Sequence, residues 1–252
     1  MTIDETTECP SSPDQIQPLE ILLDDGPLIA LNKPAGLLTQ GVPHAQLTLE
    51  GQVKAELKTR LGKPGNVYLG VPHRLDRPVS GVVVFAKNSK AAARLAEQFR
   101  ERMVRKTYLA VVEGVPVPDE GLLEDWLLKD AVAAHVTVVP AGTEGAKRAS
   151  LAYRVLAVHQ GRSLVQIELQ TGRMHQIRVQ FASRGWPIVG DRQYATNQIP
   201  TAGETDELRL AQIALHAWRL ELKHPIRYDD IRIEAPLPPH WDPYGFALPK
   251  RV

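Results

Sequence analysis

Residues 73–81 read His-Arg-Leu-Asp-Arg-Pro-Val-Ser-Gly, and they lie between two apolar runs rich in β-branched residues, 67–71 and 82–85. Such runs are typical of strands, so we expect the nine residues to form the loop that joins two strands. Pro78 and Gly81 suit a loop of fixed shape, the first through its locked φ and the second through its freedom at positive φ.

The loop carries one carboxylate, Asp76, between Arg74 and Arg77. Neighbouring guanidinium groups favour the ionised carboxylate, so its pKa is expected to fall below the free value. Asp76 is therefore a poor general acid at neutral pH but a candidate nucleophile or ion-pair partner. On these residues alone, the competing interpretation is that the segment is an ordinary charged loop that only connects two strands.

Charge is concentrated around this loop. Residues 54–106 hold 13 of the 30 Lys and Arg but only 4 of the 29 Asp and Glu, a local net charge of +9 in a chain whose net charge is +1. Part of this excess belongs to ordinary solvated helix faces. Its position around Asp76 nevertheless predicts a polyanionic partner.

The composition is that of a soluble globular protein, with 252 residues, 43% hydrophobic and 23% charged. A single cysteine, Cys9, excludes an internal disulfide framework and fits a reducing compartment. No run approaches the apolar length of a membrane span, and the N-terminal residues show no basic n-region or hydrophobic h-region, so we expect a cytoplasmic protein. Phosphate-binding glycine loops, paired cysteines and His-Glu-x-x-His are absent from the sequence, and metal catalysis is not expected.

The first half of the chain alternates strand and helix signals. Residues 1–18 have four acids, three prolines and no Lys or Arg, which indicates a flexible arm. Strands are expected at 19–23 and 28–31, joined by a turn. Thr48 can cap a helix that ends at Gly62.

Ser89 can cap a second helix, with Arg94, Arg100 and Arg102 outward or flanking. Its expected inward face consists of Ala92, Leu95, Ala96, Phe99 and Met103. The strand-like run 105–112 follows, in which Lys106, Tyr108 and Ala110 share one face.

The second half reads as strands around one further helix. Short strands are expected near Trp126, Val136 and 151–158, and a clearer one at 163–169. A helix over roughly 173–184 would place His175 and Arg178 on one face. Residues 195–209 read as a loop, strands are expected at 219–222 and 231–233, and Pro236, Pro238 and Pro239 are expected to end the fold.

His73-Arg74-Leu75-Asp76 followed by Ser80-Gly81 resembles the active-site signature of the pseudouridine synthases of the large-subunit-rRNA (RluA) type. Further segments resemble the companion motifs of that family, in the same order. They are Asn32–Leu37, which in the family closes the floor of the cleft, Lys106–Ala110, Gly172–Arg178 in the pattern Gly-Arg-x-His-Gln-Ile-Arg, Pro187–Asp191 and Leu215–Ala217. One departure is Gln180, where many members have histidine, and its role stays open.

The resemblance implies an α+β fold with a mixed, largely antiparallel sheet flanked by helices. Many relatives carry a small RNA-binding domain before the catalytic one, but the arm 1–18 is too short to be that domain, so we expect a single catalytic domain over 19–245 without a separate N-terminal RNA-binding domain. It implies that Asp76 attacks the target nucleotide, that Tyr108 stacks on the base and assists the proton step, and that Arg178 keeps Asp76 ionised. Arg74 would enter the space that the flipped base leaves, while Leu75 is expected in the core. The candidate RNA-binding residues are Arg74, Arg77, Lys106, Arg173, His175, Arg100 and Arg102.

Pseudouridine formation cuts the bond from ribose C1′ to uracil N1 and rejoins the base through C5, so no cofactor and no metal is expected. The expected partner is an RNA stem-loop, from rRNA rather than tRNA by the habits of the family, and the protein is expected to be a monomer that needs no protein partner. Two other functions stay open. One is an N-glycosidic hydrolase on nucleic acid, and the other is a catalytically silent RNA-binding protein, which the complete set of Asp76, Tyr108 and Arg178 disfavours.

Overall fold

The computed structural model describes residues 18–41, 47–62, 64–130, 135–195 and 212–246. Residues 1–17 of the expected arm (1–18) and residues 196–209 of the expected loop (195–209) lie outside the described residues. The described strands are β1 (Ile21–Asp25), β2 (Leu28–Lys33), β3 (Ser80–Ala86), β4 (Arg105–Glu113), β5 (Glu120–Lys129), β6 (Val136–Val139), β7 (Lys147–His159), β8 (Arg162–Leu169), β9 (Leu215–Lys223) and β10 (Asp230–Glu234).

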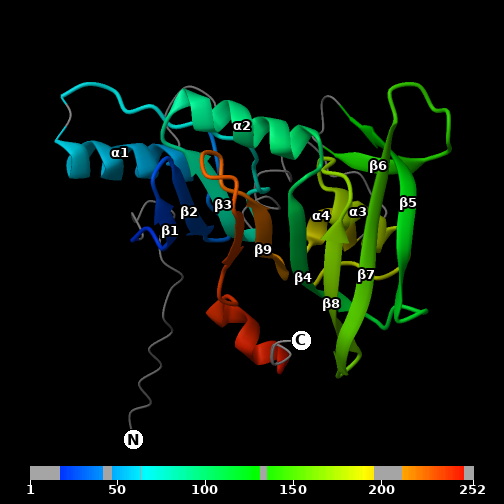
Figure 1. Cartoon of the computed structure of the whole chain (residues 1–252). Coiled ribbons are helices and arrows are strands. Elements are labelled where there is room, and N and C mark those ends of the chain that lie inside the picture. Colours follow the sequence, from blue (N-terminus) through cyan, green and yellow to red (C-terminus); the bar gives the residue numbers. More distant parts are fainter. Residues whose placement is uncertain (1–17, 42–46, 63, 131–134, 196–211, 247–252) are drawn as a thin grey trace, which may run out of the picture.

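The described strands join in one sheet that crosses the whole molecule, from β1 and β2 at one end to β5 and β6 at the other (Figure 1). Its order is β1-β2-β3-β9-β4-β8-β7-β5-β6, and β10 pairs with β9. All named strand pairs are antiparallel except β3 with β9. This confirms the expected α+β class with a mixed, largely antiparallel sheet.

Helices cover both faces of the sheet at β2 and β3. Alternate residues of a strand point to opposite faces, and the odd-numbered Ile29, Leu31 and Val83 pack with α1 (Leu49–Leu61). The even-numbered Leu28, Ala30 and Val82 pack with α2 (Ser89–Arg100). The strands near the loop are therefore buried on both sides, which gives the loop a rigid base.

The ends of the first two helices follow local capping rules. The Thr48 side chain accepts a hydrogen bond from the Gly51 amide, and Gly62 ends α1 in the left-handed conformation, as predicted. The second helix is capped by Asn88, whose side chain accepts from the Ala91 amide, so the prediction of Ser89 as the cap was wrong by one residue. Met103 lies beyond this helix and is 58% exposed, and Ala96 is exposed on the helix itself, so the predicted inward positions of these two residues were also wrong.

Residues 67–71 do not form the predicted strand. They run extended and make a single bridge, between Gly70 and Ala86. Their apolar character reflects packing instead, because Leu69 is buried and Val67 and Val71 lie against the same core. The apolar run was therefore a correct sign of burial and a wrong sign of strand pairing.

The remaining helices are short: α3 (Gln176–Ala182), α4 (Arg192–Ala195) and a 3-10 helix (Pro239–Tyr244). The 3-10 helix extends the ordered chain past the prolines that were expected to end the fold, and its Trp241 is buried in the main core. In Figure 1, α3 and α4 lie behind β7 and β8. None of the described helices has the length and apolar character needed to cross a bilayer.

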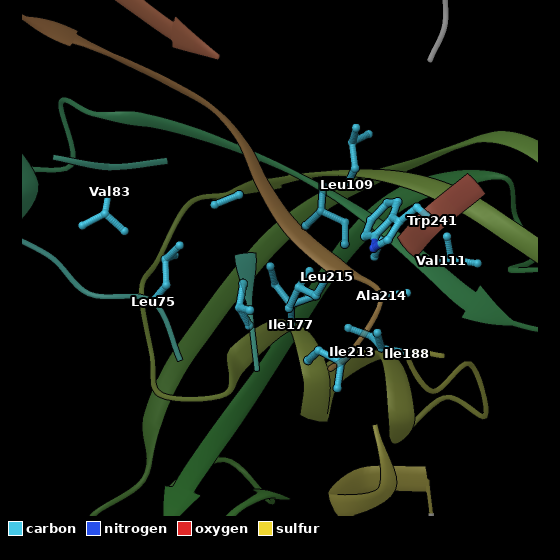
Figure 2. Close-up of a cluster of buried hydrophobic side chains, with 14 of the residues drawn as sticks. Leu75, Val83, Leu109, Val111, Ile177, Ile188, Ile213, Ala214, Leu215 and Trp241 are labelled. Atoms are coloured by element: carbon cyan, nitrogen blue, oxygen red, sulfur yellow. The ribbon is translucent and has the colours of Figure 1, made fainter. Parts of the chain in front are cut away.

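Two residues of the main apolar core each lie next to a candidate site residue in the chain. Leu75 precedes Asp76, and Ile177 precedes Arg178; both belong to the same buried apolar cluster as Leu215 (Figure 2). The expectation that Leu75 is a core residue is confirmed. The packing of Leu75 and Ile177 thus fixes the backbone just before Asp76 and just before Arg178, the two members of the candidate ion pair.

Candidate active site

The loop that carries Asp76 is held from below by the turn after β2. Lys33 is fully buried, and its ammonium donates to the carbonyls of Pro34, Leu37 and Arg77 at 2.9, 2.7 and 3.2 Å. Gly36 and Arg77 exchange two further bonds of 2.8 Å, from the Gly36 amide to the Arg77 carbonyl and from Arg77 Nε to the Gly36 carbonyl. Burial lowers the pKa of Lys33 to about 7, although the negative charge of Asp76 opposes the shift.

Thr39 also binds the loop, at the residue before Asp76. Its hydroxyl donates to the Leu75 carbonyl at 2.9 Å and accepts from the Leu75 amide at 3.1 Å. The segment 32–39 therefore forms the support of the loop. None of its residues is among those that line the cleft described below, so it is not the cleft floor that the resemblance implied for Asn32–Leu37.

The two ends of the loop are tied to the sheet. At the first end, His73 Nε2 accepts a hydrogen bond from the Val84 amide at 3.0 Å, and its ring stacks on Phe99. Burial lowers the pKa of His73 to about 3, so the ring is neutral and suited to accepting this bond. At the other end, Ser80 Oγ and His216 Nδ1 hydrogen-bond at 2.8 Å.

Gly81 allows the close contact between β3 and β9 that follows the loop. Its φ is 115°, and a Cβ there would lie 2.2 Å from the Ala217 carbonyl oxygen. Only glycine combines this backbone angle with this space. The loop is thus supported on three sides, and Asp76 is presented from a fixed backbone.

A cleft of about 670 Å³ opens above the loop. It brings together residues from the loop, α2, β4 and the segment before α3, which are far apart in the sequence. Predicted site residues that line it are Asp76, Tyr108, Arg178, Arg74, Lys106, Arg173, His175, Arg100 and Arg102. Arg77 does not line it, and its Nε is engaged with the Gly36 carbonyl.

Two donors approach the same oxygen of Asp76. His175 Nε2 and Arg178 Nη1 each lie 3.9 Å from Asp76 Oδ2, while the Asp76 side chain remains 33% exposed. No hydrogen bond to either side-chain oxygen of Asp76 is present among the described residues, since both 3.9 Å contacts are longer than a hydrogen bond. The carboxylate is therefore flanked on one side by protein donors and is open to the cleft on the other.

Arg178 has a closer partner than the sequence indicated. Its Nε and Nη2 donate to the two oxygens of Asp191 at 2.6 and 2.8 Å, and Nη2 also donates to Gln193 Oε1 at 2.9 Å. Asp76 is thus a second, more distant carboxylate for this guanidinium. Burial by itself would lower the pKa of Arg178, but the hydrogen bonds and charge of Asp191 raise it above its usual value.

The helix that carries Arg178 is shorter than predicted. It begins at Gln176, and His175 precedes it as the capping residue with φ 52°, in the left-handed region. His175 and Arg178 therefore do not share a helical face, and their common approach to Asp76 comes from this turn of the backbone. Burial lowers the pKa of His175 to about 4, although Asp76 opposes the shift, so the ring is neutral at pH 7.

Tyr108 enters the cleft from β4 at an irregularity of the sheet. The pairing of β4 with β9 changes register between Thr107 and Leu109, and bulges of this kind often re-aim a side chain beside an active site. Burial, assisted by the charge of Asp76, raises the pKa of the Tyr108 phenol, which keeps its proton at neutral pH. No hydrogen bond of its hydroxyl is found within the described part of the chain.

The rim of the cleft is basic. Arg74 and Arg102 are exposed, and burial together with the neighbouring Arg102 lowers the pKa of Lys106. Arg100 is paired with Glu101 at 3.0 Å, and Arg173 Nε donates to the Arg148 carbonyl at 3.1 Å. These cations surround the opening above Asp76.

Several residues of the site were missed by sequence reasoning. Lys129 adds a cation to the rim, and Asp191 and Tyr194 contact Arg178 and His175. A signal for Asp191 existed, since Pro187–Asp191 is one of the segments that resemble family motifs, but no role was assigned to the carboxylate. Gln180 donates to Asp125 at 2.7 Å and links α3 to β5, outside the residues that line the cleft.

Comparison with known proteins finds similar sequences over most of the chain. The sequence model described as RNA pseudouridylate synthase matches residues 27–183. An uncharacterized RNA pseudouridine synthase of Zymomonas mobilis is 36% identical over 90% of this chain and 97% of its own length. A protein of Nitrosomonas europaea named ribosomal large subunit pseudouridine synthase D is 35% identical over 88% of this chain and 62% of its own length.

Two solved human structures share the fold. Human RNA pseudouridylate synthase domain containing 4 superposes with a TM-score of 0.72 at 27% identity, covering 88% of this chain and 90% of that one. Human RNA pseudouridylate synthase domain containing 1 gives 0.67 at 25% identity, covering 90% and 87%.

Proposed function

The chain belongs to the RluA-type family of RNA pseudouridylate synthases, isomerases that act on RNA, and from this premise we propose that Asp76 attacks a uridine flipped into the cleft. The observation that carries the proposal is the geometry around one carboxylate. Asp76 lies in the cleft on a loop held by Lys33 and Thr39, with Arg178 and His175 both 3.9 Å from Oδ2.

The arrangement suits a carboxylate that must form and release a bond. Donors held in place by the fold stabilise the charge without reorganising during the reaction. Because these donors approach Oδ2, we assign the attack at the sugar–base junction to Oδ1. The Oδ1–C1′ bond forms as the C1′–N1 bond breaks, and it breaks again as C5 of the turned base bonds to C1′, which restores the free carboxylate. The proton lost from C5 equals the proton gained by N1, so no outside reactant is needed.

Tyr108 and the apolar lining would hold the freed uracil. Val79, Ile177 and Leu215 line the cleft and exclude water from its floor. The protonated phenol of Tyr108 offers a stacking face and a hydroxyl beside the base. The pocket thus retains the base while it turns, which separates isomerisation from hydrolysis.

The basic rim supports binding of a structured RNA. A flipped uridine costs a few kcal/mol of lost stacking, and phosphate contacts by rim cations offset this cost. Arg74 is exposed beside Asp76 and can fill the space that the base leaves. The names of relatives such as the Nitrosomonas protein favour ribosomal RNA over tRNA, and a cytoplasmic monomer belongs to the same proposal.

Tritium release tests the function. RNA labelled at uracil C5 should lose tritium to water with this protein, and no free uracil should appear. Free uracil in proportion to the RNA consumed would identify an N-glycosidic hydrolase. RNA binding without release of tritium or uracil from any stem-loop of the ribosomal RNA would identify a silent binding protein and contradict the proposal.

A further inference from the structure

The hydroxyl of Tyr194 links two segments beside the active site. Tyr194 belongs to α4 and is 7% exposed. Its oxygen accepts a hydrogen bond from the Val136 amide at 3.1 Å and lies 2.7 Å from His175 Nδ1. The same histidine ring places Nε2 3.9 Å from Asp76 Oδ2. Tyr194 is therefore one residue removed from the candidate nucleophile.

These contacts determine which nitrogen of His175 carries the proton. Burial raises the pKa of the Tyr194 phenol, so its oxygen retains a hydrogen to donate. The backbone amide of Val136 can only donate, which occupies a lone pair of the phenol oxygen. Among the described residues, His175 Nδ1 is the acceptor within reach of the hydroxyl hydrogen. The neutral ring must then carry its proton on Nε2.

The other side of the ring favours the same tautomer. With the proton on Nε2, an N–H faces the Asp76 carboxylate. With the proton on Nδ1, a lone pair would face that negative charge and the Tyr194 hydrogen would lose its acceptor. The contacts of His175 with Tyr194 and with Asp76, on opposite sides of the imidazole ring, thus both favour the tautomer with the proton on Nε2.

We propose that Tyr194 is a positioning residue that holds His175 in the Nε2–H tautomer, so that an N–H donor faces Oδ2 of Asp76 beside Arg178. The functional part of this inference rests on the proposed role of Asp76. The role of His175 is then to orient one oxygen of the carboxylate through a neutral donor. In metal sites, outer partners of this kind fix the tautomer of a ligating histidine, and their loss typically costs roughly 10- to 100-fold; we expect a loss of the same order here.

The tyrosine ring has separate contacts that a phenylalanine would keep. It stacks on His135 with centroids 4.7 Å apart, and the Arg178 guanidinium lies 4.9 Å from its centroid. Tyr194→Phe therefore removes the hydroxyl and leaves the packing. Tyr153→Phe is the matched control, because its buried hydroxyl donates to the Pro118 carbonyl at 2.8 Å and the residue is not among those lining the cleft.

The test combines nitrogen NMR of the histidine rings with single-turnover kinetics. Wild type labelled with ¹⁵N-histidine should show the Nε2–H pattern for His175, assigned by its loss in His175→Gln. Tyr194→Phe should mix the two tautomers and slow the reaction roughly 10- to 100-fold, with RNA affinity unchanged. Tyr153→Phe should change neither, while thermal melts show similar losses of stability for both variants.

A second readout is whether the rate losses of Tyr194→Phe and His175→Gln add when the two substitutions are combined. In the His175→Gln background, Tyr194→Phe should cause no further loss of rate, because its effect passes through the ring that is gone. An Nδ1–H tautomer in wild type, an unchanged tautomer in Tyr194→Phe, or equal rates for the two Tyr→Phe variants would each overturn the inference. If Asp76→Asn retains activity while the tautomer is as expected, the assignment of Asp76 fails and the tautomer assignment stands.

Discussion

At the scale of single residues, Arg178 connects the chemistry to the core. It is 2% exposed and binds Asp191, which is also 2% exposed, with both prongs of its guanidinium. Only its third nitrogen, Nη1, approaches Asp76. Because the planar fork serves two carboxylates at once, a lysine cannot reproduce the arrangement.

Arg178→Met should lose both activity and stability. The substitution leaves Asp191 buried without its cation and removes a positive charge near Asp76, which costs roughly 3–5 kcal/mol of unfolding free energy. Denaturant melts should show that Arg178→Met with Asp191→Leu recovers much of this stability while remaining inactive. Arg178→Lys should be partly active. Wild-type activity in Arg178→Met would show that the guanidinium plays no part in the reaction.

Tyr108→Phe should bind RNA normally and form product very slowly. The aromatic face survives, and only the hydroxyl beside the base is lost. Filter binding and single-turnover assays on the same RNA separate the two effects. A wild-type rate would reduce Tyr108 to a stacking surface.

At the scale of elements, the loop 73–81 owes its shape to contacts with segments distant in sequence. Thr39 holds Leu75, Val84 holds His73, and His216 holds Ser80. The irregular pairing of β4 with β9 presents Tyr108, and the last residues of α2 contribute Arg100 to the rim. The loop, α2 and β4 thus each contribute residues that line the cleft.

RNA affinity should depend steeply on salt, and the last residue of α2 together with the residues just after the helix should supply part of this dependence. Neutralising Arg100 and Arg102 to glutamine should flatten the slope of log affinity against log salt by up to about two phosphate contacts. Arg154→Gln with Arg232→Gln, two exposed arginines that do not line the cleft, is the matched control. An unchanged slope in the Arg100/Arg102 variant would place the RNA on another surface.

Local rules predicted the elements whose ends are determined locally. Thr48 and Gly62 bound α1 through bonds within the helix itself, and the alternation of β4 follows from its own sequence. The start of α3 was not predictable in this way, because His175 adopts a positive φ in a setting made by Tyr194 and Asp76. Likewise, the family motif identified Arg178, but its pairing with Asp191 depends on how the chain folds back after α3.

At the scale of the whole molecule, burial keeps three histidines from distant parts of the chain neutral. Burial lowers the pKa of His73 to about 3 and that of His175 and His216 to about 4. In the unfolded chain such groups titrate near 6.5, as an ordinary value. Between these values the unfolded chain binds more protons than the folded protein.

Stability should therefore be lost on acidification through this window. The contribution of these histidines is present above about pH 6.5 and falls as the pH drops toward 4, by up to about 1.4 kcal/mol per pH unit for each ring. Denaturant melts between pH 7 and 5 should show this slope, and it should be shallower in His216→Asn, which can still accept from Ser80. Equal slopes in the two proteins would contradict the assignment of a neutral His216.

The central claim is that Asp76 is the attacking group of an RNA pseudouridine synthase. Its most direct test is single-turnover pseudouridine formation by Asp76→Asn, with enzyme in excess over RNA and with RNA affinity and the thermal midpoint measured on the same preparation. Asparagine keeps the shape of the side chain and removes its negative charge. The account predicts wild-type affinity, a thermal midpoint close to wild type and no product above the uncatalysed background, whereas pseudouridine formed by Asp76→Asn above that background would contradict it.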